Sequence, residues 1–327
     1  MTDKQGTNSM DQGTQDKKSW LSLASPILKN QSDEEILANA GADYKVHLKP
    51  VTLWDSLNDS LVELKSRFVT CRPNPNGLHW DYWEVVKERY EVVQNTDLLE
   101  RAKGVIARTN GTAKLHSCGV LDEGRKFFVA MSFGSIALKV RDTESGINSF
   151  LILMSSHDGS IPICYYNLDV NQSRNTVYRV SSETYDFDLR KRHTKNLKGH
   201  EVEASEAIEL RKNWSMAMAD AVGALQKPIG PSMKKDAMNV VASVETANTK
   251  KKREHAEDVH SKIEELFRKD YNSGLFGETR WAFYNAIIEY VDFYRDIDPL
   301  DAAQHTLEID NYSHRLKVRV FDILAKQ

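Results

Sequence analysis

The central part of the chain alternates apolar and polar residues at the spacing of β-strands. Pairs of such segments flank short turn sequences: 114–119 with 126–131, 136–140 with 150–154 around a turn at 144–146, and 161–166 with 176–180. Alternation is typical of strands with one buried face, and a turn between two such segments predicts an antiparallel hairpin. Shorter segments at 43–50, 68–71 and 82–86 predict further strands. The pattern therefore predicts a mostly antiparallel central sheet.

Helical spacing dominates from residue 201 onward. Apolar residues recur three or four positions apart over 203–225, 259–267, 280–294 and 312–325. Before the sheet, Ser32 with Glu35 forms a capping-box pattern, residues 57–64 suggest a short helix, and Asn95 or Thr96 is a plausible N-cap for a helix over 98–107. The fold class expected is α+β, with a helical C-terminal third.

Three regions follow from this pattern. Residues 1–30 are polar and predict a disordered tail, in which the apolar island around Trp20 is expected to dock on the body. Residues 31–200 predict an α+β sheet domain. Residues 201–327 predict a helical region that packs on the sheet domain or extends from it.

Composition places the chain among ordinary globular proteins. Of its 327 residues 40% are hydrophobic and 28% are charged, and its net charge is −3, so binding to nucleic acid would need a local basic patch. Three widely spaced cysteines fit a reducing compartment. The N-terminus lacks an apolar signal segment, and no apolar run reaches the roughly 20 residues of a membrane span. We expect a cytoplasmic protein without a membrane partner, in the host cytoplasm if a phage encodes it.

The segment Ser155–Ser160 follows one predicted strand and precedes another. Its His157 and Asp158 could act as a general base with its orienting carboxylate, or as metal ligands. Alternatively, Asp158 and Gly159 form a tight turn in which the carboxylate accepts backbone hydrogen bonds. The turn is the interpretation we favour.

A second polar cluster, Arg190–Lys195, contains Arg190, Arg192, His193 and Lys195, with Asp188 just before it. Such a run before a helix could contact phosphate, or could be a solvated loop. Tyr165, Tyr166 and Tyr178 with Arg179 could stack on bases while Arg174 meets phosphate. The alternative is that these tyrosines cover the sheet beneath helices.

Several catalytic signatures are absent from the sequence. It contains no phosphate-binding Gly-rich loop, no dinucleotide fingerprint, no zinc spacing and no Gly-x-Ser-x-Gly segment. An ATPase, a Rossmann enzyme and a serine hydrolase of the nucleophile-elbow type are therefore not expected.

Five short segments occur in order along the chain: Asp33–Tyr44 with Pro50–Val51, Arg89–Asn95, Ser156–Ser160, Arg192–Thr194, and Thr279–Ala286 with Glu289–Tyr290. In this order they resemble a phage/plasmid-like family that shares a domain of unknown function, number 932. Ser156-His-Asp-Gly-Ser160 is the most specific of them. One segment departs, because the family's Cys-x-Asn-Thr-type stretch is matched only by Asn175-Thr176. The resemblance implies an origin in a phage, prophage or plasmid, and no known activity.

Two functional hypotheses follow, and a third is kept beside them. The first is a non-enzymatic protein that binds or anneals single-stranded DNA in replication or recombination, through Arg174, Tyr178, Arg190, Arg192, His193 and Lys195, and forms homo-oligomers. The second is an enzyme such as a metal-dependent nuclease, in which His157, Asp158 and His193 converge, with Mg²⁺ as a possible cofactor; the first needs none. The third is a structural or host-interaction protein of a mobile element.

Overall fold

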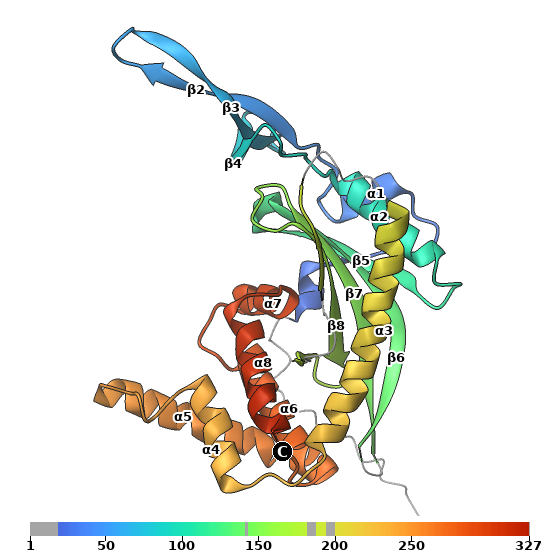
Figure 1. Cartoon of the computed structure of the whole chain (residues 1–327), viewed down its shortest axis with the longest axis vertical. Helices are drawn as coiled ribbons and strands as arrows, with labels where there is room; N and C mark the ends of the chain where they lie inside the picture. Colours follow the sequence, from blue (N-terminus) through green and yellow to red (C-terminus); the bar gives the residue numbers. More distant parts are fainter. Residues whose placement is uncertain (1–18, 141–142, 182–187, 194–199, 327) are drawn as a thin grey trace, which may run out of the picture.

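The computed structural model describes residues 19–140, 143–181, 188–193 and 200–326. They form a large antiparallel sheet with helices on both faces, and a smaller sheet that projects from it as an arm (Figure 1). This arrangement confirms the α+β class. In the part of the chain that the structure describes, no helix is long and apolar enough to cross a bilayer.

The large sheet contains seven strands in the order β1-β5-β6-β7-β8-β10, with β9 paired to β8. They are β1 (Ser25–Pro26), β5 (Lys114–Leu121), β6 (Lys126–Val140), β7 (Thr143–Ser156), β8 (Ile163–Asn171), β9 (Val177–Tyr178) and β10 (Asp188–Lys191). All pairs are antiparallel, and β5–β6 and β6–β7 form the first two predicted hairpins. The third prediction holds only in part, because β9 pairs with residues 169–170 of β8, whereas residues 163–166 pair with β10.

The turn predicted for the second hairpin is at the wrong position, because residues 144–146 are paired strand residues of β7. Gly146 suggested a turn, but a glycine is needed there because the Gln172 side chain packs directly against its backbone. A Cβ at this position would lie 1.9 Å from the side-chain oxygen of Gln172.

Helices cover both faces of the sheet. On one face lie α1 (Asp33–Asn39), α2 (Asn95–Ala107) and part of α3 (His200–Leu225), packed on a cluster that includes Tyr165. On the other face, the 3₁₀ turn η2 (Trp20–Leu23) and α7 (Pro299–Leu307) pack on a cluster that includes Tyr166. Consecutive strand residues point to opposite faces, so both tyrosines are buried under helices, as the alternative interpretation held.

The C-terminal helices form a third core beside β9, together with the second half of α3. They are α4 (Pro231–Val241), α5 (Lys250–Phe267), the π-helical turn η4 (Asp270–Gly274), α6 (Arg280–Phe293) and α8 (Tyr312–Ala325). Trp281, Phe283 and Tyr284 of α6 are fully buried in this core, as expected. Helix α7 was not expected, although Asp298 caps it and Pro299 occupies its first turn, a common helix start.

The arm consists of β2 (His47–Asp55), β3 (Ser60–Pro73) and β4 (Trp80–Lys87). The helix expected over residues 57–64 is wrong, since these residues form the β2–β3 turn and the start of β3. Turn chemistry overrides the helical spacing here. The carboxylate of Asp55 accepts hydrogen bonds from Leu57 N and Asn58 Nδ2, and Asp59 adopts a positive φ of 48°.

The N-terminal island docks on the body, as expected. Trp20 is fully buried and its ring meets the edge of Phe150 at 5.2 Å, and Ser25 pairs with Cys118 in the sheet. Residues 19–30 are thus ordered, contrary to the prediction of a disordered tail over 1–30. Residues 1–18 lie outside the described residues.

Candidate nucleic-acid interface

The two polar clusters meet at Tyr90, which comes from a third segment. The Tyr90 hydroxyl lies 3.2 Å from the carbonyl oxygens of both Ser156 and His157, where it can donate to either. Its ring stacks on His193 at 5.1 Å with an interplanar angle of 4°. Burial and the nearby charge of Asp158 raise the pKa of Tyr90, which keeps the phenol protonated as a donor. The segments 89–95, 156–160 and 192–193 therefore share one cluster.

His157 is a buried, neutral hydrogen-bond donor. Asn95 donates from Nδ2 to Ala42 O, so its Oδ1 accepts, and His157 Nε2 donates to it at 2.9 Å. The imidazole stacks against Trp83 at 5.7 Å. Burial lowers the pKa of His157 to about 4. Asn95 therefore orients this histidine and is not the helix N-cap, which is Gln94.

His193 is held in the opposite tautomer. Its Nδ1 lies 3.3 Å from the carbonyl oxygen of Glu91, which can only accept, so Nε2 accepts from the Ser155 hydroxyl at 3.1 Å. Burial lowers the pKa of His193. A serine donating to a histidine is the arrangement of an activated nucleophile, but Ser155 is only 2% exposed. As folded here, the pair stabilises the end of β7.

Asp158 and Gly159 form the turn that the sequence favoured. Asp158 Oδ1 accepts from Ser160 N at 2.9 Å, and Gly159 has φ +77°. Partial burial opposes ionisation, but the hydrogen bonds from Ser160 and Ser156 and the charge of Lys126 together outweigh it and lower the pKa of Asp158. His157, Asp158 and His193 thus each bind a different partner. Within the described ranges, no group of three or more His, Cys, Asp or Glu side chains is placed to hold a metal ion.

Three exposed arginines flank the Tyr90 cluster. Arg89 precedes Tyr90, Arg192 precedes His193, and the carbonyl of Arg125 accepts from His157 N at 2.7 Å. None of their guanidinium groups makes an ion pair or hydrogen bond with another described side chain. Free cations grouped in this way suit an anionic ligand. Only Arg192 was singled out from the sequence.

Beside this cluster, the base of the arm and the body enclose an open cleft of about 550 Å³. Its lining includes Arg72, Asn74, Trp80, Tyr82, Trp83, Glu123 and Arg125. On one face of β4, Lys49 Nζ lies 3.3 Å from the centre of the Trp80 ring, and Tyr82 is 56% exposed. On the other face, Trp83 contacts His157. The segment Ser156–Ser160 therefore packs, through His157, against Trp83 of the cleft wall.

Arg72 joins the two walls of the cleft. It donates to Asp81 Oδ2 at 3.1 Å within the arm and to Glu123 O at 2.9 Å on the body, and its guanidinium lies 4.3 Å from the Tyr44 ring centre. Tyr44 in turn donates to Gly124 O at 2.6 Å. Gly124 has φ +88°, and a Cβ on it would meet the Arg72 guanidinium. The position therefore requires glycine for conformation and for space.

The other candidates lie elsewhere. Tyr178 is fully buried, stacks on Trp281 at 5.1 Å and donates to Asn285 Oδ1 at 2.9 Å, so a base cannot stack on it as the chain is folded here. Arg174 also donates to Asn285 Oδ1, at 2.8 Å, and ties the β8–β9 turn to α6. We therefore leave both out of the interface. Lys195 lies outside the described residues.

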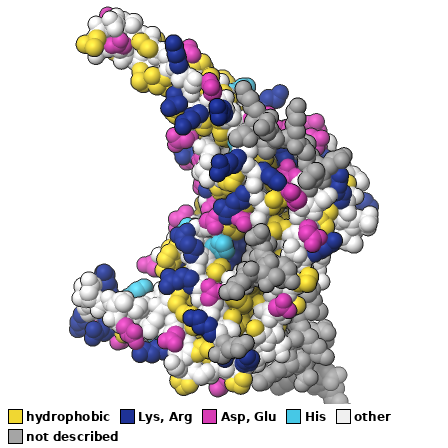
Figure 2. Space-filling model, viewed as in Figure 1, with side chains coloured by type: hydrophobic (Ala, Val, Ile, Leu, Met, Phe, Trp, Pro, Cys, Tyr) yellow, Lys and Arg dark blue, Asp and Glu magenta, His cyan; other side chains and the backbone are white. Residues whose placement is uncertain are grey.

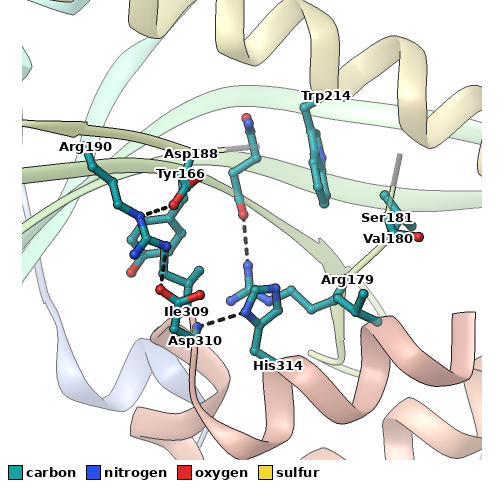
Figure 3. Close-up of a pocket in the computed structure, with 12 residues that line it drawn as sticks. Tyr166, Arg179, Val180, Ser181, Asp188, Arg190, Trp214, Ile309, Asp310 and His314 are labelled. Atoms are coloured by element: carbon teal, nitrogen blue, oxygen red, sulfur yellow. Dashed lines mark hydrogen bonds and ion pairs between the residues drawn. The ribbon is translucent and has the colours of Figure 1, made fainter. Parts of the chain in front are cut away.

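Arg190 lies at the rim of a second, smaller cavity of about 250 Å³ between β8, β10, α3 and α8 (Figure 3). It forms ion pairs with both Asp188 and Asp310. His314 Nδ1 accepts from the Asp310 backbone N–H at 2.9 Å beside it. Since its charge is already neutralised by two carboxylates, Arg190 is a weaker candidate for phosphate than Arg192.

Comparison with known proteins assigns the chain to a family. Residues 83–317 match the model of a domain described as Domain of unknown function (DUF932). The match includes the Tyr90 cluster and α6, whereas the segments around Asp33 and Pro50 and most of the arm lie outside it. Comparisons with curated proteins and with solved structures each gave no significant match. Because the match spans well over half of the chain, the protein belongs to the DUF932 family.

Proposed function

We propose that the chain binds single-stranded DNA, with bases in the cleft at the base of the arm and the phosphate backbone on Arg89, Arg125 and Arg192. The observation that carries the proposal is a cleft lined by the aromatic rings of Trp80 and Tyr82 and by Arg125, which makes no ion pair with a described side chain. Arg89 and Arg192 flank the neighbouring Tyr90 cluster. Aromatic rings stack on any base, and cations follow the backbone, so this combination is typical of sequence-tolerant single-strand binding.

The cleft also favours a single strand over a duplex. Its walls bear Trp80 and Tyr82 on a sheet edge, and stacking on them requires an unpaired base. Asp81 and Glu123 also line the cleft, but the Asp81 carboxylate is held by Arg72 and Asn74. Arg89, Arg125 and Arg192 supply positive charges that make no ion pair with another described side chain. We place this activity in the replication, recombination or annealing of a phage or plasmid, in the cytoplasm of its host, without a catalytic step.

The test is fluorescence anisotropy with a labelled single strand and with its duplex over a range of salt concentrations. Removing one cation that binds a phosphate should reduce the slope of log K against log salt by about 0.7 for a single strand. We expect Arg125→Ala and Arg192→Ala each to reduce that slope and the affinity. Arg190→Ala is the matched control, because its guanidinium is neutralised by two carboxylates, and it should change binding much less.

Two results would contradict the proposal. One is binding that does not depend on salt and is unchanged in the double variant Arg125→Ala/Arg192→Ala. The other is cleavage of the strand when Mg²⁺ is added, which would indicate an enzyme.

A further inference from the structure

The free end of the arm carries a cluster of exposed apolar side chains, which we call the arm tip: Leu53, Trp54, Leu57, Leu61 and Val62. Trp54 is 60% exposed and Leu57 is 93% exposed. Figure 2 shows hydrophobic side chains gathered at this end of the molecule. Contiguous exposed apolar surface on a soluble protein marks an interaction site.

Nothing in the described chain covers the arm tip. Leu53 pairs with Val62 and Trp54 pairs with Leu61 across β2 and β3, so neighbouring pairs point to opposite faces of the ribbon. Both faces are thus apolar, and two strands alone have no second layer to bury them. A ribbon of this kind is marginally stable in water, which favours a partner that covers it.

The charges on the arm tip define the partner. Residues 50–64 contain Asp55, Asp59 and Glu63 and no Lys or Arg. A complementary surface would therefore be an apolar hollow with cations at its margin, since opposite charges across an interface steer association and fix its register.

The body of this chain has such a hollow, which we call the α2–α3 hollow. It measures about 490 Å³ and is lined by Arg108, Thr109, Asn110, Thr112, Phe133, Ile208, Arg211, Lys212 and Ser215. The lining therefore includes two apolar side chains and three cations, and none of these residues is acidic. Arg211 is tied to Asp169 at 3.8 Å, whereas Lys212 makes only an exposed pair with Glu209.

We propose that the arm tip of one copy inserts into the α2–α3 hollow of a second copy. The arm projects away from the body, so the tip does not fill the hollow of its own chain (Figure 1). The contact joins two different surfaces, which makes it heterologous. Repetition of such a contact builds a ring or a filament, head to tail.

The test is sedimentation velocity of the full chain without nucleic acid, from micromolar to tens of micromolar concentration. We expect concentration-dependent association. Trp54→Glu should weaken it by about tenfold or more, since buried tryptophans dominate interface energies. Lys212→Glu/Ser215→Glu, which places two acids at the hollow, should weaken it similarly. Leu78→Glu is the matched control: Leu78 is 86% exposed but lies at the β3–β4 turn, away from the arm tip.

Mixing the two variants gives the decisive result. The tip variant keeps an intact hollow, and the hollow variant keeps an intact tip. In the mixture, the tip of the hollow variant can therefore bind the hollow of the tip variant, which should give dimers that do not associate further. A wild type that stays monomeric, association that survives Trp54→Glu, or a mixture that remains monomeric would overturn the proposal. Circular dichroism of each variant shows whether it is folded.

Discussion

Acidification should destabilise the fold through His157, and the size of the effect can be worked out. Burial holds the pKa of this imidazole at about 4 in the folded protein, against its ordinary value of 6.5. The unfolded chain therefore takes up a proton between these values while the folded chain does not. The free energy of unfolding is therefore unaffected by protonation of this imidazole above pH 6.5, and it decreases as the pH falls from 6.5 to about 4. The full difference corresponds to roughly 3 kcal/mol, of which about 2 kcal/mol is lost between pH 7 and pH 4.5.

The variant His157→Phe isolates this contribution. At pH 7 it should unfold about 1–2 kcal/mol more easily, because Asn95 Oδ1 loses its donor in a buried site. Between pH 7 and pH 4.5 it should lose about 2 kcal/mol less stability than the wild type. Urea unfolding followed by circular dichroism at both pH values measures this, with exposed His79→Phe as the control. Equal acid losses in wild type and His157→Phe would refute the reasoning.

Three further outcomes are expected. Lys317→Met should lower the free energy of unfolding by about 3–5 kcal/mol, because the fully buried Asp292 carboxylate would lose its ion-pair partner at 2.5 Å. Urea unfolding measures this, and a loss under about 1 kcal/mol would contradict it. Ser32→Ala should cost about 1 kcal/mol by removing the N-cap of α1, as seen by thermal unfolding, whereas Ser32→Asp should cost little. Tyr82→Ala should weaken single-strand binding by about 1–3 kcal/mol while Tyr82→Phe retains it, and equal affinities in an anisotropy titration would exclude stacking there.

Much of the fold follows from local pattern in the sequence. Alternation located β5, β6, β7 and β8 of the large sheet but not the pairing of β8 with β10, and Ser32 with Glu35 located the start of α1. The local pattern failed where two signals competed. The leucines at 57, 61 and 64 have helical spacing, but the hydrogen bonds to the Asp55 carboxylate and the positive φ of Asp59 form a turn. Because both faces of this two-stranded ribbon are apolar, its sequence also lacks the alternation of apolar and polar residues that identifies a strand.

The candidate site was predicted only in part. The sequence identified the segments 156–160 and 190–195 as polar clusters, but not that Tyr90 joins them, because that contact spans 66 residues along the chain. It selected Tyr178 for stacking because tyrosines on strands can face solvent. Burial of that tyrosine depends on α6, which lies 107 residues away at Asn285. Tyr82 was assigned only to a strand and Trp80 to no element, since nothing local distinguishes a covered face of a strand from an open one.

The arm and the large sheet share no strand pairing among the described residues, so side chains such as Arg72 and Tyr44 hold the arm at its base. Changing the arm's angle would therefore break a few side-chain contacts and no backbone ladder. A strand bound in the cleft would touch both sides of this junction and restrict its movement. Amide hydrogen exchange at the arm base should then slow on binding more than exchange in β6 and β7, whose backbone amides are already paired.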